Sequence, residues 1–252
     1  MKARHGVLAL LLSYACTDRA DLSTESTTAA LGVLPPTESA AWKRVGSSDV
    51  PDARYAQAVA FDETRQVVVM FGGIANSPDG SMNPQQDTWE WSPVQGAWKA
   101  RTIAGAKPAA RSGAAMAYDS VRKTFVLFGG RAGSGYDYQD IWEWDPATGV
   151  WTDKTGSGAK PEARAQHAMI FDSKAGKIVL FGGGRSQIGG DVMTVSLAFA
   201  DTWEYDGASA TWSERATTGA PSARVDFGFA YSGQTNKAYL FGGLEITSAN
   251  MG

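Results

Sequence analysis

The chain has 252 residues, 43% hydrophobic and 19% charged, with a formal net charge of −3 at pH 7, and this length suits one large all-β domain or two ordinary domains. A mildly acidic chain without a basic run lacks the electrostatic footprint of a protein that binds nucleic acid or an anionic membrane. One cysteine and two histidines exclude an intrachain disulfide and argue against cysteine-rich or histidine-rich metal sites. We therefore expect neither a metal nor a cofactor.

Residues 1–16 resemble a secretory signal peptide. Lys2 and Arg4 form a positive segment, and the apolar run from Val7 to Leu12 is too short to span a bilayer. Cys16 at the end of this segment is similar to the lipidated cysteine of bacterial lipoproteins, and the alternative is simple cleavage that leaves a free cysteine. The segment predicts export to the cell envelope, in the periplasm, the outer membrane or the cell surface, with membrane contact only through a lipid anchor.

The next segment, residues 17–40, has the composition of a flexible tether. It is rich in serine and threonine and contains Pro35 and Pro36, which disfavour a packed core. We therefore divide the chain into a signal peptide at 1–16, a linker at 17–40 and a folded domain at 41–252.

Three short motifs recur in a fixed order along the rest of the chain. Phe-Gly-Gly begins at residues 71, 128, 181 and 241, and Pro-x-x-Arg ends at residues 54, 111, 164 and 224, so both recur at intervals of 57, 53 and 60 residues. Asp-x-Trp-Glu begins at residues 87, 140 and 201. A period of this length, kept by several motifs in phase, indicates a repeat architecture.

Each unit is expected to contain four strands. The first follows the arginine, at residues 56–61, 114–118, 168–171 and 228–231, and the second ends in the glycine pair, at 67–71, 125–128, 178–181 and 238–241. The third is the Asp-x-Trp-Glu motif, at 87–91, 140–144 and 201–205, and the fourth carries Trp98, Trp151 or Trp212. Side chains alternate along these segments with the period of two that strands have, and no segment shows helical periodicity.

Four-stranded units with these motifs resemble kelch repeats, which build β-propellers. The resemblance covers residues 42–252 and implies an all-β, kelch-type propeller with three complete blades and fragments of a fourth. Trp42 is expected in a fourth strand without earlier partners. We favour a truncated chain, with completion of the ring by another chain or a distorted four-blade ring as the alternatives.

The glycines and tryptophans of the motifs are expected to be structural. Glycine removes a side chain where a strand end turns or meets a neighbour closely. Tryptophan supplies large apolar area between stacked blades. These residues are Gly72, Gly73, Trp89, Trp98, Gly129, Gly130, Trp142, Trp151, Gly182, Gly183, Trp203, Trp212, Gly242 and Gly243.

The arginines of Pro-x-x-Arg are candidate ligand-binding residues. The resemblance places them at the start of the innermost strand, at one mouth of the central channel, where some kelch domains use arginines to bind acidic peptides. The alternative is that each arginine pairs with a carboxylate, such as Glu90, Glu143 or Glu204, or caps backbone carbonyls between blades. Their identity in every unit favours this alternative. The four residues are Arg54, Arg111, Arg164 and Arg224.

The segments between the second and third strands, 74–86, 131–139 and 184–200, differ most between units, so we expect ligand specificity there. Aromatic and arginine side chains are favoured at interfaces. The candidate contact residues are Tyr136, Tyr138, Arg185 and Gln187. Asp79, Asp137 and Asp191 lie in the same segments, but no EF-hand-like spacing supports a calcium site.

His167 is the one histidine outside the N-terminal segment. Its counterparts three residues after the other arginines are Gln57, Ala114 and Phe227. Such freedom predicts a packing or hydrogen-bonding position and disfavours a catalytic role.

Two function classes remain. The first is an exported binding or scaffolding module with a protein or glycan partner, bound at the propeller face that bears the segments between the second and third strands. The alternative is a fragment of a kelch-propeller enzyme, sugar-acting or cyclase-like, whose catalytic residues lie mostly outside this chain. The copper oxidase of this family needs two histidines and a cysteine-linked tyrosine, which this segment lacks. We therefore predict no catalytic residues and favour a non-enzyme, with a degraded gene product as a third alternative.

Overall fold

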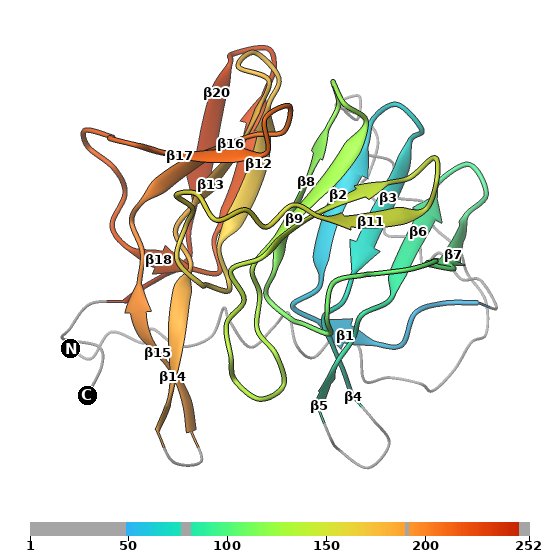
Figure 1. Ribbon diagram of the computed structural model, residues 1–252, viewed down its shortest axis with the longest axis horizontal. Coiled ribbons are helices and arrows are strands. Elements are labelled where there is room, and N and C mark those ends of the chain that lie inside the picture. The colour runs from blue at the N-terminus through green and yellow to red at the C-terminus, as the bar shows by residue number, and fades with distance from the viewer. Residues whose placement is uncertain (1–48, 77–81, 190–191, 247–252) are drawn as a thin grey trace, which may run out of the picture.

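The computed structural model describes residues 49–76, 82–189 and 192–246, and these residues form strands and turns without a helix. Figure 1 shows twisted antiparallel sheets standing side by side. Cys16, Trp42, Asp79 and Asp191 lie outside the described residues, as do the predicted signal peptide and linker. In the part of the chain that is described, no helix is long and apolar enough to cross a membrane.

Three sheets have four strands each and follow the chain order. The first blade consists of β2 (Ala58–Asp62), β3 (Val67–Phe71), β6 (Thr88–Ser92) and β7 (Ala97–Arg101). The second consists of β8 (Ala115–Asp119), β9 (Thr124–Phe128), β10 (Ile141–Asp145) and β11 (Val150–Asp153). The third consists of β12 (Ala168–Asp172), β13 (Lys177–Phe181), β16 (Thr202–Asp206) and β17 (Thr211–Arg215). The fourth unit contributes β19 (Gly228–Ser232) and β20 (Lys237–Phe241).

The first strand of every unit is the innermost one. Contacts between units run from β2 to β8, from β8 to β12 and from β12 to β19. This arrangement of antiparallel blades around an axis is that of a β-propeller, and it confirms the predicted fold class.

Three smaller sheets lie at one end of the blades, the lower end in Figure 1. They pair β1 (Arg54–Tyr55) with β4 (Ile74–Asn76) and β5 (Met82–Pro84), β14 (Gly184–Gly189) with β15 (Val192–Ala198), and β18 (Arg224–Val225) with β21 (Leu244–Glu245). Two of the three segments expected to be loops between the second and third strands therefore contain strand pairs. They project beyond the blades on the side where the Pro-x-x-Arg segments also lie.

The predicted start of the first strand is wrong by two residues in the first unit. The strand begins at Ala58 because Ala56 has a φ of +53°, in the left-handed region that ends an extended strand. The preceding Arg54–Tyr55 pairs instead with Ala75 and Ile74 of β4. The arginine thus lies before the innermost strand, on a separate short ladder.

Apolar side chains fill the space between neighbouring blades. Between the first and second blades, Phe71 and Trp151 meet edge to face with ring centroids 5.2 Å apart, and the second-blade residues Phe125 and Trp144 belong to the same core cluster. Between the second and third blades, Phe128 meets Trp212 in the same way at 5.2 Å. Such aromatic burial is the main stabilising interaction between blades.

The glycine pairs lie where adjacent blades touch. A side chain on Gly129, which has a φ of +64°, would place Cβ 2.5 Å from the backbone oxygen of Arg164 in the next blade. The following residue, Gly130, donates its backbone N–H to that same oxygen at 2.9 Å. The first glycine therefore permits the close approach, and the second makes a hydrogen bond between blades.

Candidate binding site

The arginine of each complete blade is held by a carboxylate at the start of the third strand. Arg111 Nη1 and Nη2 donate to Asp140 Oδ1 and Oδ2 at 2.6 and 2.7 Å. Arg111 Nη1 also donates to the Gly129 oxygen and Nε to the Ala109 oxygen. Trp142 Nε1 donates to Asp140 Oδ2 at 2.8 Å. All three nitrogens of the Arg111 guanidinium therefore donate to protein acceptors.

The first and third blades repeat this geometry with Arg54 and Asp87, and with Arg164 and Asp201. The three arginine side chains are 4%, 1% and 0% exposed in chain order. Burial alone would raise the pKa of the Asp201 carboxyl, but the hydrogen bonds and charge of Arg164 outweigh burial and hold that pKa below its usual range. The Asp201 carboxyl therefore stays ionised beside the buried Arg164 guanidinium.

Aromatic rings cover two of the buried arginines. The Tyr138 ring lies over Arg111 and the Phe199 ring over Arg164, each with its centroid 4.0 Å from the guanidinium carbon. Both rings stand two residues before the aspartate of their blade, where the first blade has Gln85. One face of the candidate contact residue Tyr138 is thus occupied by a cation–π contact.

The structure favours the pairing alternative for Arg54, Arg111 and Arg164, since none of them presents its guanidinium to solvent. The specific partners that we expected are wrong. The arginine pairs instead with the aspartate that immediately precedes the strand carrying each expected glutamate. The role of these arginines as ligand contacts stays a prediction.

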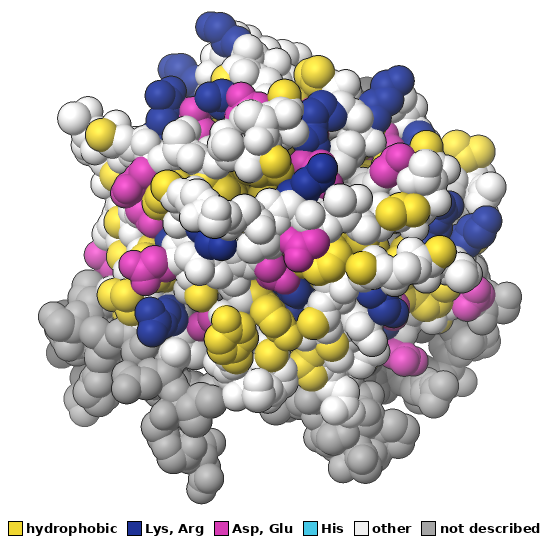
Figure 2. Space-filling model, viewed as in Figure 1, with side chains coloured by type: hydrophobic (Ala, Val, Ile, Leu, Met, Phe, Trp, Pro, Cys, Tyr) yellow, Lys and Arg dark blue, Asp and Glu magenta, His cyan; other side chains and the backbone are white. Residues whose placement is uncertain are grey.

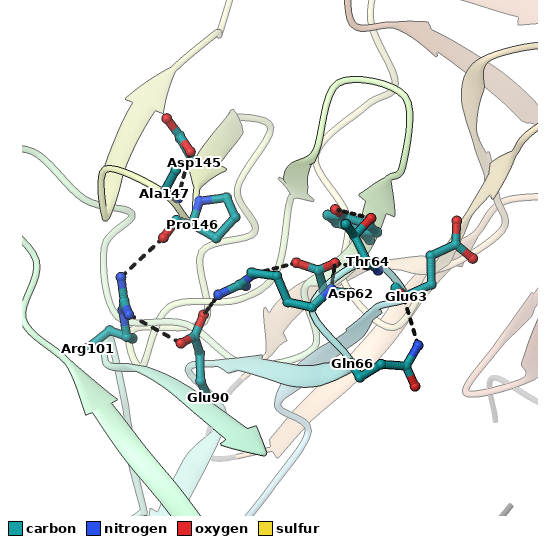
Figure 3. A network of polar contacts seen from close by, with 11 residues as sticks. Asp62, Glu63, Thr64, Gln66, Glu90, Arg101, Asp145, Pro146 and Ala147 are labelled. Atoms are coloured by element: carbon teal, nitrogen blue, oxygen red, sulfur yellow. Dashed lines mark hydrogen bonds and ion pairs between the residues drawn. The ribbon is translucent and has the colours of Figure 1, made fainter. Parts of the chain in front are cut away.

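The expected glutamates pair with other cations. Glu90 accepts from Arg65 Nη1 at 2.7 Å and from Arg101 Nη1 at 3.3 Å. Figure 3 shows Arg101 between Glu90 of its own blade and the backbone oxygen of Pro146 in the second blade, to which Nη2 donates at 3.2 Å. The equivalent glutamates pair with Arg122 in the second blade (Glu143), and with Lys177 and Arg215 in the third (Glu204). These networks join the glutamate on each third strand to cations from other parts of its own blade, including the turn between the first two strands, where Arg65 and Arg122 lie.

Arg224 differs from the other three arginines. It is part-exposed, and its guanidinium donates to the Gly242 oxygen at 2.8 Å and to Ser222 Oγ at 2.7 Å. No carboxylate pairs with it among residues 49–76, 82–189 and 192–246. Its role as a ligand contact stays a prediction.

A pocket of about 170 Å³ opens at the propeller axis, on the same side as the small sheets. It lies where the innermost strands begin. Each unit contributes two residues to it, the second and the third after the arginine. We call it the axial pocket. Its lining residues are Ala56, Gln57, Gly113, Ala114, Gln166, His167, Asp226 and Phe227.

The rim of the axial pocket is a chain of left-handed residues. Ala56, Gly113, Gln166 and Asp226 have φ values of +53°, +63°, +59° and +53°. Backbone N–H groups of Gly113, Gln166 and Asp226 each donate to the oxygen of the corresponding residue in the preceding blade, at 2.7, 2.7 and 3.2 Å. Strain of this kind in non-glycine residues persists only where surrounding contacts enforce it, and it gathers at binding sites.

Several polar atoms in the axial pocket lack a partner among the described residues. They are Gln57 Oε1, Gln166 Oε1 and both ring nitrogens of His167. Unsatisfied buried polar groups are rare because each costs about 1–3 kcal/mol. The pocket therefore contains unused hydrogen-bonding capacity that a water or a ligand would satisfy.

The charge state of the pocket follows from its enclosure. Burial, reinforced by the positive charge of Arg164, lowers the pKa of His167 to about 3, so the imidazole is neutral at physiological pH. Desolvation raises the pKa of Asp226, although the hydrogen bond from Gln166 Nε2 at 2.7 Å counteracts it. Two amide oxygens and one carboxylate thus face the pocket, and they accept hydrogen bonds.

The candidate contact residues outside the axial pocket do not gather in one place. Tyr136 is 64% exposed and meets Tyr138 edge to face. Arg185 lies on β14 with an ion pair to exposed Glu162 at 3.6 Å. Gln187 lies on the same strand, but its side chain is outside the described ones. These positions surround the projecting sheets, and their role as contacts stays a prediction.

Asp137, the described member of the calcium candidates, is already bound by protein. It is buried and accepts from Arg131 Nε at 2.7 Å and from the Ser186 backbone N–H at 2.6 Å. Among the residues that the structure describes, no three His, Cys, Asp or Glu side chains lie together in a way that could hold a metal ion.

His167 packs as a core residue, with its ring 5.6 Å from that of Phe128. Sequence reasoning missed Gln57, Gln166 and Asp226 as pocket residues. The variability that we noted three residues after each arginine could have found Gln57, whereas Gln166 and Asp226 lie only two residues after their arginines.

Comparison with known proteins identifies relatives over parts of much longer chains. Host cell factor 1 of Rattus norvegicus is 28% identical over 216 residues, which are 77% of this chain and 10% of that protein. Dynein regulatory complex subunit 7 of Chlamydomonas reinhardtii is 29% identical over 117 residues, 46% of this chain. tRNA wybutosine-synthesizing protein 4 of Aspergillus fumigatus is 34% identical over 106 residues, 41% of this chain. The chain spans about a tenth of the length of these curated relatives.

The fold is also similar to a solved structure. The structure of YjhT superposes with a TM-score of 0.55 at 15% identity, over 71% of this chain and 57% of that chain, which supports the fold alone. A family model described as the KLHDC2/KLHL20/DRC7 Kelch-repeats domain matches residues 21–243. This match covers most of the chain, and the chain therefore belongs to the kelch-repeat domain family.

Proposed function

We propose that this chain is a protein-interaction module that binds a partner at the end of the propeller where the axial pocket opens. The observation that carries the proposal is the set of unpartnered polar atoms of Gln57, Gln166 and His167 at that pocket, beside the Asp226 carboxylate. The small sheets β4–β5 and β14–β15 project around the same end and enlarge the surface that a partner would contact. A propeller end of this kind suits a protein partner because rigid blades hold variable segments in fixed positions.

The hydrogen-bonding groups of the axial pocket indicate which chemical group of the partner would bind there. Buried arginines are neutralised by Asp87, Asp140 and Asp201, so they do not attract an acidic peptide. The pocket instead offers amide oxygens and the Asp226 carboxylate, which accept hydrogen bonds from an ammonium or guanidinium group. We expect a partner segment that presents a lysine, an arginine or a free amine.

The relatives and the surface support an interaction role. One relative is named as a subunit of a regulatory complex. On the face shown in Figure 2, basic and acidic side chains are interspersed and do not gather into a basic patch, which disfavours a nucleic-acid partner. His167 is buried and neutral with neither ring nitrogen bonded to a hydroxyl or thiol, which disfavours nucleophilic catalysis.

Selection from a displayed random-peptide library tests the proposal. We expect enrichment of peptides with basic residues, and Asp226→Asn should weaken their binding about tenfold, as the loss of one charge-assisted hydrogen bond predicts. Glu162→Gln is the matched control, since it removes an exposed carboxylate outside the axial pocket. Enrichment of acidic peptides, or equal binding by the two variants, would contradict the proposal.

The location of the module is part of the same proposal. Export and lipid attachment at Cys16 rest on the N-terminal pattern of Lys2, Arg4 and an apolar run. Mass spectrometry of the membrane fraction from a bacterial host tests them, with a lipidated Cys16 as the expected result. An unmodified N-terminal segment in the soluble fraction would contradict the cell-envelope location. It would not affect the conclusion drawn from peptide binding.

A further inference from the structure

The two interfaces between complete blades differ at one tryptophan. At the first interface, Trp151 Nε1 donates to Thr88 Oγ1 of the neighbouring blade at 3.2 Å. Trp212 is the equivalent residue at the second interface, and the strand register places Ile141 at the position of Thr88. Isoleucine has no acceptor, so Trp212 Nε1 is buried without a hydrogen-bond partner among the described residues. The indole N–H is a donor that this interface leaves unused.

A pocket of about 270 Å³ lies at this position. We call it the lateral pocket, because it opens between the outer strands of the second and third blades. Ile141 and Trp212 line it, and both belong to the core cluster between those blades. Trp212 is 9% exposed, and its unsatisfied donor is therefore enclosed by the residues that form the pocket. The other lining residues are Lys154, Gly156, Gly158, Ala159, Lys160, Ala210 and Thr211.

The charge of the lateral pocket is positive. Its lining contains two lysines and no acidic residue. Lys160 Nζ donates to the Gly156 oxygen at 2.9 Å, which keeps its ammonium group at the rim. Two ammonium groups and an indole N–H are all donors, so the pocket is matched to an anionic acceptor.

Lys154 does not form the ion pair that the equivalent residues of the other two complete blades form. Arg101 and Arg215 occupy the same position in the other blades and pair with Glu90 and Glu204. Glu90 pairs with Arg101 in addition to Arg65, whereas the equivalent Glu143 of the second blade pairs with Arg122, and Lys154 forms no ion pair within the described part of the chain. Its charge is therefore available to a ligand.

We propose that the lateral pocket binds a small carboxylate. One carboxylate oxygen accepts from Trp212 Nε1, the two lysines neutralise its charge, and an apolar body packs on Ile141 and the indole. The volume is just below the roughly 300 Å³ at which pockets for drug-sized ligands begin, so the ligand is a compact acid. The proposal is independent of the axial pocket and of the peptide partner.

Titration of the ¹⁵N-labelled full chain with benzoate tests the site directly. We expect a saturable shift of the Trp212 indole N–H resonance, which Trp212→Phe assigns, while the Trp151 indole resonance stays unchanged. Benzamide, which has the same ring without the charge, should shift the Trp212 signal much less. An unmoved Trp212 signal at saturating benzoate would overturn the proposal.

A matched pair of substitutions isolates the indole donor. Ile141→Thr restores the acceptor found at the first interface and should engage Nε1, so benzoate affinity should fall about tenfold. Ile141→Val has nearly the same shape without a hydroxyl and should bind benzoate within about twofold of the unmodified chain. Both variants are expected to fold because Thr88 already occupies this position in the first blade. Equal loss of affinity in both would contradict the role of the indole.

Substitution of the lysines and a second probe complete the test. The double substitution Lys154→Gln and Lys160→Gln should weaken benzoate binding and abolish its dependence on salt, because the screened attraction is removed. An acetylated dipeptide that ends in phenylalanine carries the same carboxylate on a peptide. Tighter binding of the dipeptide identifies a protein terminus as the source, whereas tighter binding of benzoate identifies a free acid. Affinity that is unaffected by the lysine substitutions would overturn the anionic ligand class.

Discussion

Two positions only three residues apart in each unit play different parts in this propeller. The arginine at the first position is the same in every unit, and in the complete blades it is buried against an aspartate. The second position holds Gln57, Ala114, His167 or Phe227 and lines the axial pocket. Residues that every unit shares hold the blade together, whereas residues that differ between units shape the site.

The fourth arginine shows that the pairing depends on the aspartate and not on the arginine alone. Arg224 makes the same hydrogen bond to a glycine oxygen as Arg111 and Arg164 do. It has no carboxylate partner in the described residues and remains part-exposed. In the units that the structure describes, the arginine is buried where an aspartate pairs with it.

The largest predicted loss of stability follows removal of the aspartate charge that pairs with the shared arginine. Asp201→Asn leaves Arg164, which is 0% exposed, without its counter-charge, and this should lower the free energy of unfolding by about 3–5 kcal/mol. Urea unfolding followed by tryptophan fluorescence measures the loss. Glu162→Gln breaks an ion pair whose partners are 56% and 61% exposed, and it should cost no more than about 1 kcal/mol. Similar losses in the two variants would show that the shared pairs are not structural.

A second prediction compares glycines at equivalent positions of two units, where their surroundings differ. Gly129 and Gly242 have φ values of +64° and +71°, but only Gly129 faces the backbone of a next blade in the described structure. Replacement by alanine strains the backbone equally at both positions, at about 1–2 kcal/mol. Gly129→Ala should cost about 1–3 kcal/mol more because its Cβ would overlap the Arg164 oxygen. Thermal or urea unfolding separates the two, and equal losses would assign the whole effect to φ.

The sequence predicts the blades well because their chemistry is periodic. Phe-Gly-Gly and Asp-x-Trp-Glu fix the ends of the second and third strands, and the observed strands β3 and β6 lie within a residue of the expected ranges. Propeller strands pair with their chain neighbours, so local motifs determine the topology. The same argument fails at Ala56. This residue has a left-handed backbone conformation that no motif predicts, and it separates the short strand β1 from β2.

The site was harder to predict because it depends on contacts between units. The exposure of an arginine is decided by an aspartate about 30 residues later in the chain, and both candidates, Asp140 and Glu143, lie on the same short segment. The axial pocket combines residues from four units, each of which looks like an ordinary strand start in isolation. The lateral pocket depends on Ile141, which stands where the first blade has Thr88. This difference matters only because Trp212 of the third blade packs against that position.

The last prediction concerns a position that differs between units. Because the pKa of His167 is lowered to about 3 from an ordinary value of 6.5, the unfolded chain binds a proton that the folded chain excludes as pH falls below 6.5. Stability should therefore decrease in this window by at most about 1.4 kcal/mol per pH unit. His167→Phe, which copies Phe227, should remove this dependence. Urea unfolding at several pH values between 7.5 and 4.5 measures the difference between the two proteins.

Gln57→Ala serves as the control for this pH dependence. It copies Ala114 at the equivalent position and changes no titratable group, so its stability difference from the unmodified chain should be constant across the same pH values. The acidic groups, including Asp201 with its lowered pKa, titrate alike in both chains and cancel in the comparison. A difference for His167→Phe that is equally flat would mean that the imidazole takes up its proton in the folded chain at the same pH as in the unfolded chain. The axial pocket would then carry a cation below the ordinary pKa of 6.5 and would disfavour a basic partner there.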